Sequence, residues 1–433
     1  MKIRSILFIL GVTFSQFSLA QQTLPRDPDC CTSIMVGKLA STDGSVMTSH
    51  TCDSWYRTWV NVVPAADFAN DTVMNIYDGR MHTESVNDQT KLTVKGQIPQ
   101  AKHTYAFLDT AYPCLNEKQL AMGETTISGR DTLRNPKGMF MIEELARVAL
   151  QRCTTARDAI QLMGKLVKEY GYGDSGECLT IADPKEVWHF EIFGEGPDQI
   201  GGVWAAVRIP DDEVGISANI SRISTLNLKD TRNYMASENV FSVAKKLKLW
   251  DGKEPFKFWK VYGGPNYFGK MQAFSIREFF ILSTLAPSLK LSMDDEELPL
   301  SVKPEKKISN ADVMAYLRQT YEGTEWSVTK NLKVAVKDRK TGKTDTITSP
   351  RANPWMRTDE VQLFNALQKG AVTANRNVAV PQCAYSTVIQ LRDWLPDAVG
   401  GVCWNSPTKS TSCTTPEMPD WRHSWVRFWN FSV

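Results

Sequence analysis

Apolar positions recur along the chain with two different periods, and each period predicts a kind of element. Residues 33–38 and 45–50 are rich in strand-forming side chains and flank a Thr-Asp-Gly turn, which predicts a β-hairpin. Residues 138–170 instead place apolar side chains three and four positions apart, with a pair of threonines in the middle and Gly171 at the end. This pattern predicts two helices that form a hairpin.

The central and later parts of the chain extend the same alternation. Further strands are expected at residues 179–182, 187–193, 203–209 and 214–219. Further helices are expected at residues 235–249, 275–284 and 311–320, and loops at 286–308 and 337–354. Runs of strands beside paired helices, rather than a strict strand–helix alternation, predict an α+β fold.

The overall composition narrows the function classes. The 433 residues include 50 Lys and Arg against 48 Asp and Glu, so the chain is nearly neutral. No global charge favours nucleic acid or an anionic membrane as a partner. The length allows one large domain or two ordinary ones.

The amino terminus has the features of a secretory signal. Lys2 and Arg4 precede an apolar stretch at residues 6–17, and Ser18-Leu19-Ala20 is a small-x-small cleavage site. Residues 1–20 are therefore predicted to be a signal peptide that directs export to the periplasm or the medium. The apolar stretch is too short to span a bilayer comfortably, and no later run is long enough, so no membrane span is expected.

The nine cysteines do not form a recognisable scaffold. Export makes disulfides chemically possible, but the density is low and there is no C-x-x-C pair. Most cysteines are expected to be small buried hydrophobes. Neither a metal nor a cofactor is expected, because the sequence lacks the zinc-protease, P-loop and dinucleotide-binding motifs.

Two adjacent cysteines follow the signal and a short polar segment. A cysteine that becomes the first residue after processing can use its own α-amino group as the base. The ordinary pKa of a thiol is near 8.5 and that of an α-amine near 8, so the proton can transfer without a large pKa shift. The alternatives are a cysteine that merely begins a strand or a strained disulfide between Cys30 and Cys31. Spacing alone does not choose between the two cysteines.

Further polar residues lie where the predicted strands end. Asp53 and His50 reach the far end of the first hairpin, where Asp53 can orient the nucleophile; each can equally be a packed or solvated residue. Asn219 ends the strand at 214–219 and can donate to an oxyanion or simply shape a turn. Arg222 can hold a substrate carboxylate or form a surface salt bridge.

Several segments resemble one family over most of the chain, namely the PepD-like dipeptidases, which are relatives of secernin and N-terminal nucleophile hydrolases. The most specific blocks are Cys31-Thr-Ser-Ile-Met-Val-Gly-Lys38, Gly123-Glu124-Thr125, Ile181-Ala-Asp-Pro-Lys-Glu-Val-Trp188, Trp204-Ala-Ala-Val-Arg-Ile-Pro-Asp211 and Ala218-Asn219-Ile-Ser-Arg222. Two departures stand out: His50 occupies a position where many relatives have Arg, and the resemblance ends near Ser410.

The resemblance implies a four-layer αββα sandwich and amide hydrolysis by an N-terminal Cys. The position of the family motif along the chain implies that Cys31 is the nucleophile. Residues 21–30 are then a propeptide, 31–409 the hydrolase domain and 410–433 a divergent or truncated tail. The resemblance also implies catalytic roles for Asp53 and Asn219, and substrate-binding roles for Arg222 and Glu124.

The leading functional hypothesis is an exported cysteine dipeptidase that acts on small peptides and that could form a homo-oligomer. One alternative is an amide hydrolase of the same fold that acts on non-peptide amides, such as bile salts or penicillins. Another is a catalytically silent binding protein that retains the fold.

Overall fold

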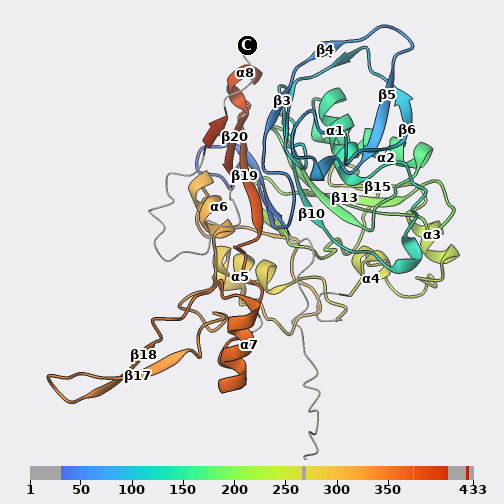
Figure 1. The fold of residues 1–433 in the computed structure, drawn as a ribbon. Helices are drawn as coiled ribbons and strands as arrows, with labels where there is room; N and C mark the ends of the chain where they lie inside the picture. The colour runs from blue at the N-terminus through green and yellow to red at the C-terminus, as the bar shows by residue number, and fades with distance from the viewer. Residues whose placement is uncertain (1–30, 266–269, 374, 408–425, 429–433) are drawn as a thin grey trace, which may run out of the picture.

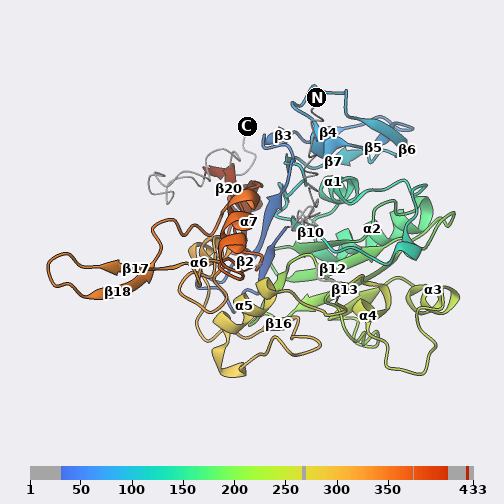
Figure 2. The same cartoon turned by 60° about the horizontal axis from the view of Figure 1, so that its bottom comes forward.

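The computed structural model describes residues 31–265, 270–373, 375–407 and 426–428. The predicted signal peptide, the propeptide and Cys30 lie outside these residues. Within them, two large antiparallel sheets dominate the fold, and helices lie on either side of the pair (Figures 1 and 2). The predicted α+β class with antiparallel strands is therefore confirmed.

The first sheet carries the amino-terminal hairpin at its centre. Its strands, in spatial order, are β16 (Ser301–Val302), β14 (Val214–Ser217), β1 (Ser33–Val36), β2 (Val46–Asp53), β19 (Cys383–Leu391), β20 (Val402–Pro407) and β21 (Val426–Phe428). The hairpin is thus joined on one side to the middle of the chain and on the other to its carboxy-terminal part. The three described residues of the predicted tail add the outermost strand.

The second sheet is built from the middle of the chain. Its order is β15 (Tyr234–Ala236), β13 (Val203–Ile209), β12 (Val187–Phe193), β11 (Glu177–Ala182), β10 (Ala121–Thr126), β9 (Leu115–Asn116), β8 (Phe107–Asp109) and β3 (Asn61–Val63). Three small two-stranded sheets accompany it: β4 (Ala66–Asp67) with β7 (His103–Thr104), β5 (Val73–Asp78) with β6 (Thr93–Pro99), and β17 (Lys333–Lys337) with β18 (Thr344–Thr348).

The helices divide between the two sheets. The α-helices are α1 (Ile142–Arg152), α2 (Ala156–Tyr170), α3 (Val240–Lys246), α4 (Phe258–Tyr262), α5 (Ile276–Leu285), α6 (Asn310–Leu317), α7 (Thr358–Leu367) and α8 (Asp397–Gly400), and the 3-10 turns are Arg80–His82, Asp131–Leu133 and Pro287–Leu289. Helices α1 and α2 share a buried cluster with β10, β11 and β12. Helices α5 and α6 share another with β1, β2 and β14. A third cluster, which includes Met35, Val46, Leu115 and Ile389, joins the facing sides of the two sheets.

Local sequence explains the best-predicted elements. Thr155 caps α2 by accepting a hydrogen bond from the Asp158 backbone N–H, and Gly171 ends it with φ 83°, a conformation that favours glycine. Ser275 and Glu278 form a capping box at the start of α5. The strands predicted at 187–193 and 203–209 have those bounds in the structure.

Two expectations were wrong in detail. Residues 234–236 form β15 rather than the start of a helix, because they pair with β13. Residues 344–348 form a strand instead of a loop, and the hairpin of β17 and β18 projects from the body of the molecule (Figure 1). Its side chains are mostly exposed, so no alternation of buried and exposed positions marked it in the sequence.

The structure also bears on the cysteines and on the membrane. Cys52, Cys114, Cys153, Cys178 and Cys403 are buried free thiols packed in hydrophobic clusters, as the sequence predicted. In the part of the chain that the structure describes, no helix has both the length and the apolar character needed to cross a bilayer.

Candidate active site

The first hairpin brings its two ends together at Cys31. Residue Thr32 pairs with Thr51 across the hairpin, and the Thr51 N–H donates to the Thr32 carbonyl over 2.9 Å. Cys31 therefore lies two residues before β1, close to the end of β2, where Asp53 lies. This proximity is the one that the hairpin pattern predicted.

The Cys31 side chain is fully buried. Burial, a hydrogen bond with the Cys52 side chain and the nearby Glu124 carboxylate all raise the pKa of the Cys31 thiol well above its ordinary value. The thiol is consequently protonated at neutral pH in this environment. A nucleophilic role requires a base that can take that proton.

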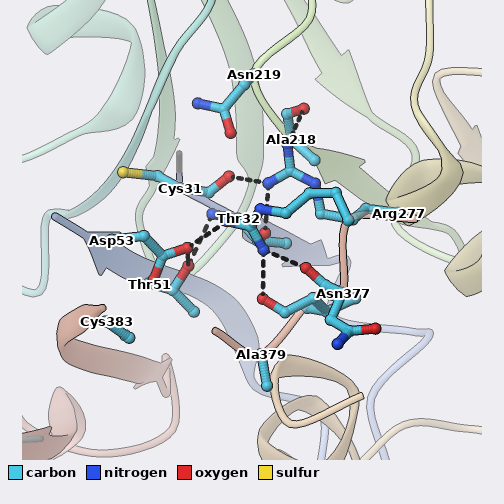
Figure 3. Close-up of polar contacts among 12 residues, drawn as sticks. Cys31, Thr32, Thr51, Asp53, Ala218, Asn219, Arg277, Asn377, Ala379 and Cys383 are labelled. Carbon is cyan, nitrogen blue, oxygen red and sulfur yellow. Dashed lines mark hydrogen bonds and ion pairs between the residues drawn. The ribbon is translucent and has the colours of Figure 1, made fainter. Parts of the chain in front are cut away.

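Asp53 is buried and fixed on one side only. Its Oδ2 accepts hydrogen bonds from Thr51 Oγ1 at 3.2 Å and from Arg376 Nη2 at 2.9 Å, while its Oδ1 has no hydrogen-bond partner (Figure 3). β19 pairs with β2 here through an irregular register next to Cys383, a bulge of the kind often found beside active sites.

Arg277 holds the backbone around Cys31. This α5 residue donates from Nη1 to the Cys31 carbonyl at 2.8 Å and from Nη2 to the Ala218 carbonyl at 2.9 Å, and it is 4% exposed (Figure 3). Neither Arg277 nor Arg376 was identified from the sequence. Arg277 lies 246 residues from Cys31 and Arg376 lies 323 residues from Asp53, and neither arginine belongs to a motif that indicates the contact.

Asn219 follows β14 and has a left-handed backbone with φ 63°, which asparagine tolerates better than most residues. Its Nδ2 donates to the Thr126 carbonyl at 2.8 Å. Its Oδ1 is buried without a hydrogen-bond partner and points toward Cys31 (Figure 3). The amide nitrogen needed for an oxyanion role is thus engaged elsewhere in this conformation, so that role stays a prediction.

The Sγ atom of Cys31 points away from Arg277 (Figure 3). Near it, His50 Nε2 lies 3.3 Å from Glu124 Oε2, within ion-pair distance if the imidazole is protonated. One ligand atom from each of Cys31, His50 and Glu124 lies within 4.8 Å of the other two, and all three residues are buried. Thiolate, imidazole and carboxylate are the ligands of zinc sites, so this trio is the group that could hold a metal ion.

Arg222 lies apart from this arrangement. It is 2% exposed, and its guanidinium donates to the backbone carbonyls of Ile216, Leu298 and Pro299. The alternative of a surface salt bridge is therefore wrong. A substrate-binding role stays a prediction, although the hydrogen bonds that the structure gives its side chain are to the protein's own backbone.

A surface hollow of about 480 Å³ lies elsewhere, lined by residues that include Arg208, Asp230 and Ser301. It includes neither the predicted catalytic residues nor Glu124. Its size alone gives it no chemical role, and the convergence of polar groups on Cys31 is the stronger indication of an active site.

Comparisons with known proteins identify the family of this chain. The profile of Peptidase family C69 matches residues 30–419. A probable dipeptidase of Latilactobacillus sakei is 26% identical over 394 residues, which cover 90% of this chain and 73% of the relative. A probable dipeptidase of Salmonella dublin is 26% identical over 68% of this chain and 67% of the relative, and a probable dipeptidase B of Streptococcus pyogenes is 27% identical over 68% and 57%. Since the family match covers most of the residues that form the fold and the site, the chain belongs to peptidase family C69 and is a hydrolase that acts on peptide bonds.

Proposed function

We propose that this protein is an exported cysteine dipeptidase that matures by losing residues 1–30, so that Cys31 becomes the first residue and the nucleophile. The names of the relatives support dipeptide hydrolysis, and the signal pattern of residues 1–20 supports export. The two sheets with α1 and α2 on one side and α5 and α6 on the other support the αββα sandwich of the N-terminal nucleophile hydrolases.

One observation carries the proposed maturation. Asp53 Oδ1 and Asn219 Oδ1 are buried acceptors without hydrogen-bond partners, and both residues border Cys31 (Figure 3). Leaving a buried acceptor unsatisfied costs about 1–3 kcal/mol. A free α-amino group on Cys31 would supply the missing donors, two or three depending on its protonation, where a peptide N–H supplies one.

The chemistry then needs no other base. The α-amine takes the Cys31 thiol proton, and the thiolate attacks the scissile carbonyl carbon to form a tetrahedral intermediate. The intermediate collapses to a thioester as the ammonium returns its proton to the leaving amine, which releases the second amino acid. Water, activated by the same amine, hydrolyses the thioester and regenerates the thiol.

The residues around Cys31 have separate tasks in this scheme. Arg277 holds the Cys31 carbonyl, and Asp53, fixed by Arg376, orients the amine. Asn219 either accepts from the amine, as its present orientation favours, or turns its amide to donate to the oxyanion. Glu124 lies beside the sulfur and is the candidate substrate-binding residue.

The deciding experiment is the amino-terminal sequence and intact mass of the secreted protein, followed by assays of chains that begin at residue 31. We expect the mature chain to begin at Cys31, to hydrolyse dipeptides and to be labelled there by iodoacetamide. Cys31→Ala should abolish hydrolysis, whereas Cys30→Ala in the full-length chain, the matched control, should leave the processed enzyme active.

Three outcomes would contradict the proposal. A chain that begins at Gln21 and still hydrolyses dipeptides would exclude the self-base mechanism. Hydrolysis of bile salts or penicillins but not of dipeptides would assign a non-peptide amide substrate. A chain that begins at Cys31 but neither hydrolyses any amide nor reacts with iodoacetamide would be a silent binding protein.

A further inference from the structure

A group of buried carboxyl side chains extends from the sulfur side of Cys31. Glu124 on β10 and Glu177 on β11 lie on the same face of the sheet, because Thr126, two residues after Glu124, pairs with Glu177. Such diagonal neighbours are within reach of each other when their side chains are long. Asp174, in the loop after α2, and Glu143, in the first turn of α1, continue the group.

These carboxyl groups retain unused acceptor atoms. Glu177 Oε2 and both carboxyl oxygens of Glu143 are buried without hydrogen-bond partners, as is the Tyr172 hydroxyl. Glu124 Oε2 is within ion-pair distance of His50 but accepts no hydrogen bond. Glu177 also forms a side-chain hydrogen bond with Glu124, which needs a proton on one of the two carboxyl groups. The other oxygens have no partner, and because buried polar groups are usually paired, a cationic donor would satisfy them.

The Tyr172 hydroxyl ties the members into one group. Burial first, and then the charges of Asp174, Glu177, Glu143 and Glu124, raise the pKa of Tyr172 well above its ordinary value. The charges of all four carboxyl groups act on this one hydroxyl, so they lie in the same buried part of the fold. The group therefore forms one acidic region rather than four separate carboxyls.

The distance to the nucleophile identifies what such a region would bind. In a dipeptide the α-nitrogen is two bonds, about 2.5 Å, from the scissile carbonyl carbon. The attacking sulfur approaches that carbon to about 3–3.5 Å. The α-nitrogen of any bound dipeptide thus lies within about 6 Å of Cys31 Sγ, and a Glu124 oxygen lies within 4.8 Å of the same atom.

We propose that Glu124, supported by Glu177, binds the α-ammonium group of the substrate, so that the site selects peptides with a free amino terminus. This inference rests on the proposed function and adds a substrate class to it. The substrate needs no separate route to the ammonium site, because a substrate that reaches the buried Cys31 already lies beside Glu124. Burial raises the pKa of Asp174 and of Glu143, so these two groups add hydrogen-bonding oxygens behind Glu124 and Glu177 rather than negative charge.

The test compares three substrates with the mature wild-type enzyme: alanyl-alanine, isobutyryl-alanine and N-acetyl-alanyl-alanine. Isobutyryl-alanine replaces the ammonium group by a methyl group of similar size, so it removes the charge without adding bulk. We expect kcat/KM to fall about 10- to 100-fold for isobutyryl-alanine, the range of one charge-assisted hydrogen bond, and further for the acetylated peptide. EDTA in every assay keeps metal ions off Cys31, His50 and Glu124.

Variants locate the effect. Glu177→Gln should raise KM for alanyl-alanine about tenfold, with little change in kcat or in the rate at which iodoacetamide labels Cys31. The preference for alanyl-alanine over isobutyryl-alanine should shrink by the same factor. Glu238→Gln is the matched control, because Glu238 is exposed and pairs only with Lys168 at the surface.

The failures are distinguishable. If alanyl-alanine and isobutyryl-alanine are hydrolysed equally well, the ammonium site is refuted while the cysteine dipeptidase proposal stands. If neither is hydrolysed and Cys31 is not labelled, the proposed function fails, and this inference fails with it. A wild-type preference that Glu177→Gln and Glu124→Gln, both folded, leave unchanged would place the ammonium group elsewhere.

Discussion

Cys31 lies between two buried regions of opposite chemistry. On its carbonyl side, the terminal nitrogens of Arg277 and Arg376 donate to oxygens of the protein itself, including the Cys31 carbonyl and Asp53 Oδ2. On its sulfur side, Glu124 and Glu177 lead into a region of carboxyl groups with unpaired oxygens. The first region is largely satisfied within the chain, whereas the second is not.

The difference indicates that the arginine side positions the catalytic groups and that the carboxyl side recognises the substrate. Burying a charge without a partner is costly, so a buried arginine paired with backbone and carboxylate oxygens fixes those oxygens in place. Unpaired buried carboxyl groups gain no such stability. A protein tolerates them where a bound ligand donates the missing hydrogen bonds. We therefore expect changes on the arginine side to lower kcat and changes on the carboxyl side to alter KM and the pH dependence of stability.

The largest effect should come from Asp53→Asn. The change removes the carboxylate that orients the amine and that accepts from Arg376, so kcat should fall about 100- to 10,000-fold, the usual range for a proton-transfer arrangement. Steady-state kinetics on one dipeptide measure it, and an unchanged circular dichroism spectrum and melting temperature verify the fold. EDTA should have little effect on the wild type. Loss of activity on chelation, with recovery on adding a divalent ion, would instead favour a metallopeptidase centred on Cys31, His50 and Glu124.

Asn219 gives the next largest effect and tests its two possible roles. Asn219→Ala should lower kcat about 100- to 1000-fold with KM nearly unchanged if the amide donates to the oxyanion. Asn219→Asp retains an acceptor but no donor, so it should be as inactive as the alanine variant in that case. If the oxygen instead accepts from the Cys31 amine, the aspartate variant should be much more active than the alanine variant. Wild-type kcat in Asn219→Ala would exclude both roles.

The smallest effect concerns stability on the carboxyl side. Burial, followed by the charges of Asp174 and Glu144, raises the pKa of Glu143 well above its ordinary value. The folded protein then binds a proton that the unfolded chain releases above about pH 4.5, so stability falls as pH rises. One such group contributes a slope of up to about 1.4 kcal/mol per pH unit.

Glu143→Gln should therefore flatten the decline in melting temperature between pH 5 and 8. The neighbouring Glu144 is the matched control, because it is equally buried but paired with Arg80 and Arg147. Glu144→Gln should lower the melting temperature at every pH, since it removes the carboxylate that pairs with Arg80 and one of the two that pair with Arg147. Identical pH profiles for Glu143→Gln and the wild type would show that Glu143 is not the source of the slope.

Local sequence predicted the elements around Cys31 well. The Thr-Asp-Gly turn between two strand-like segments was enough to place Cys31 near Asp53, because the ends of an antiparallel hairpin meet. The helix hairpin followed from its apolar period, its Thr155 cap and its Gly171 stop. The exposed hairpin of β17 and β18 was missed, since strands without a buried face carry no alternation.

The sequence by itself determined the hairpin, the helix pair and, through the resemblance, the family and the candidate nucleophile. Only the tertiary structure decided which distant groups meet there. Arg277 and Arg376 reach Cys31 and Asp53 across 246 and 323 residues. Propensity and periodicity act over a few neighbouring residues, while the pairing of buried charges is fixed by how sheets and helices pack. For the same reason the sequence identified Glu124 but not the carboxyl groups that accompany it.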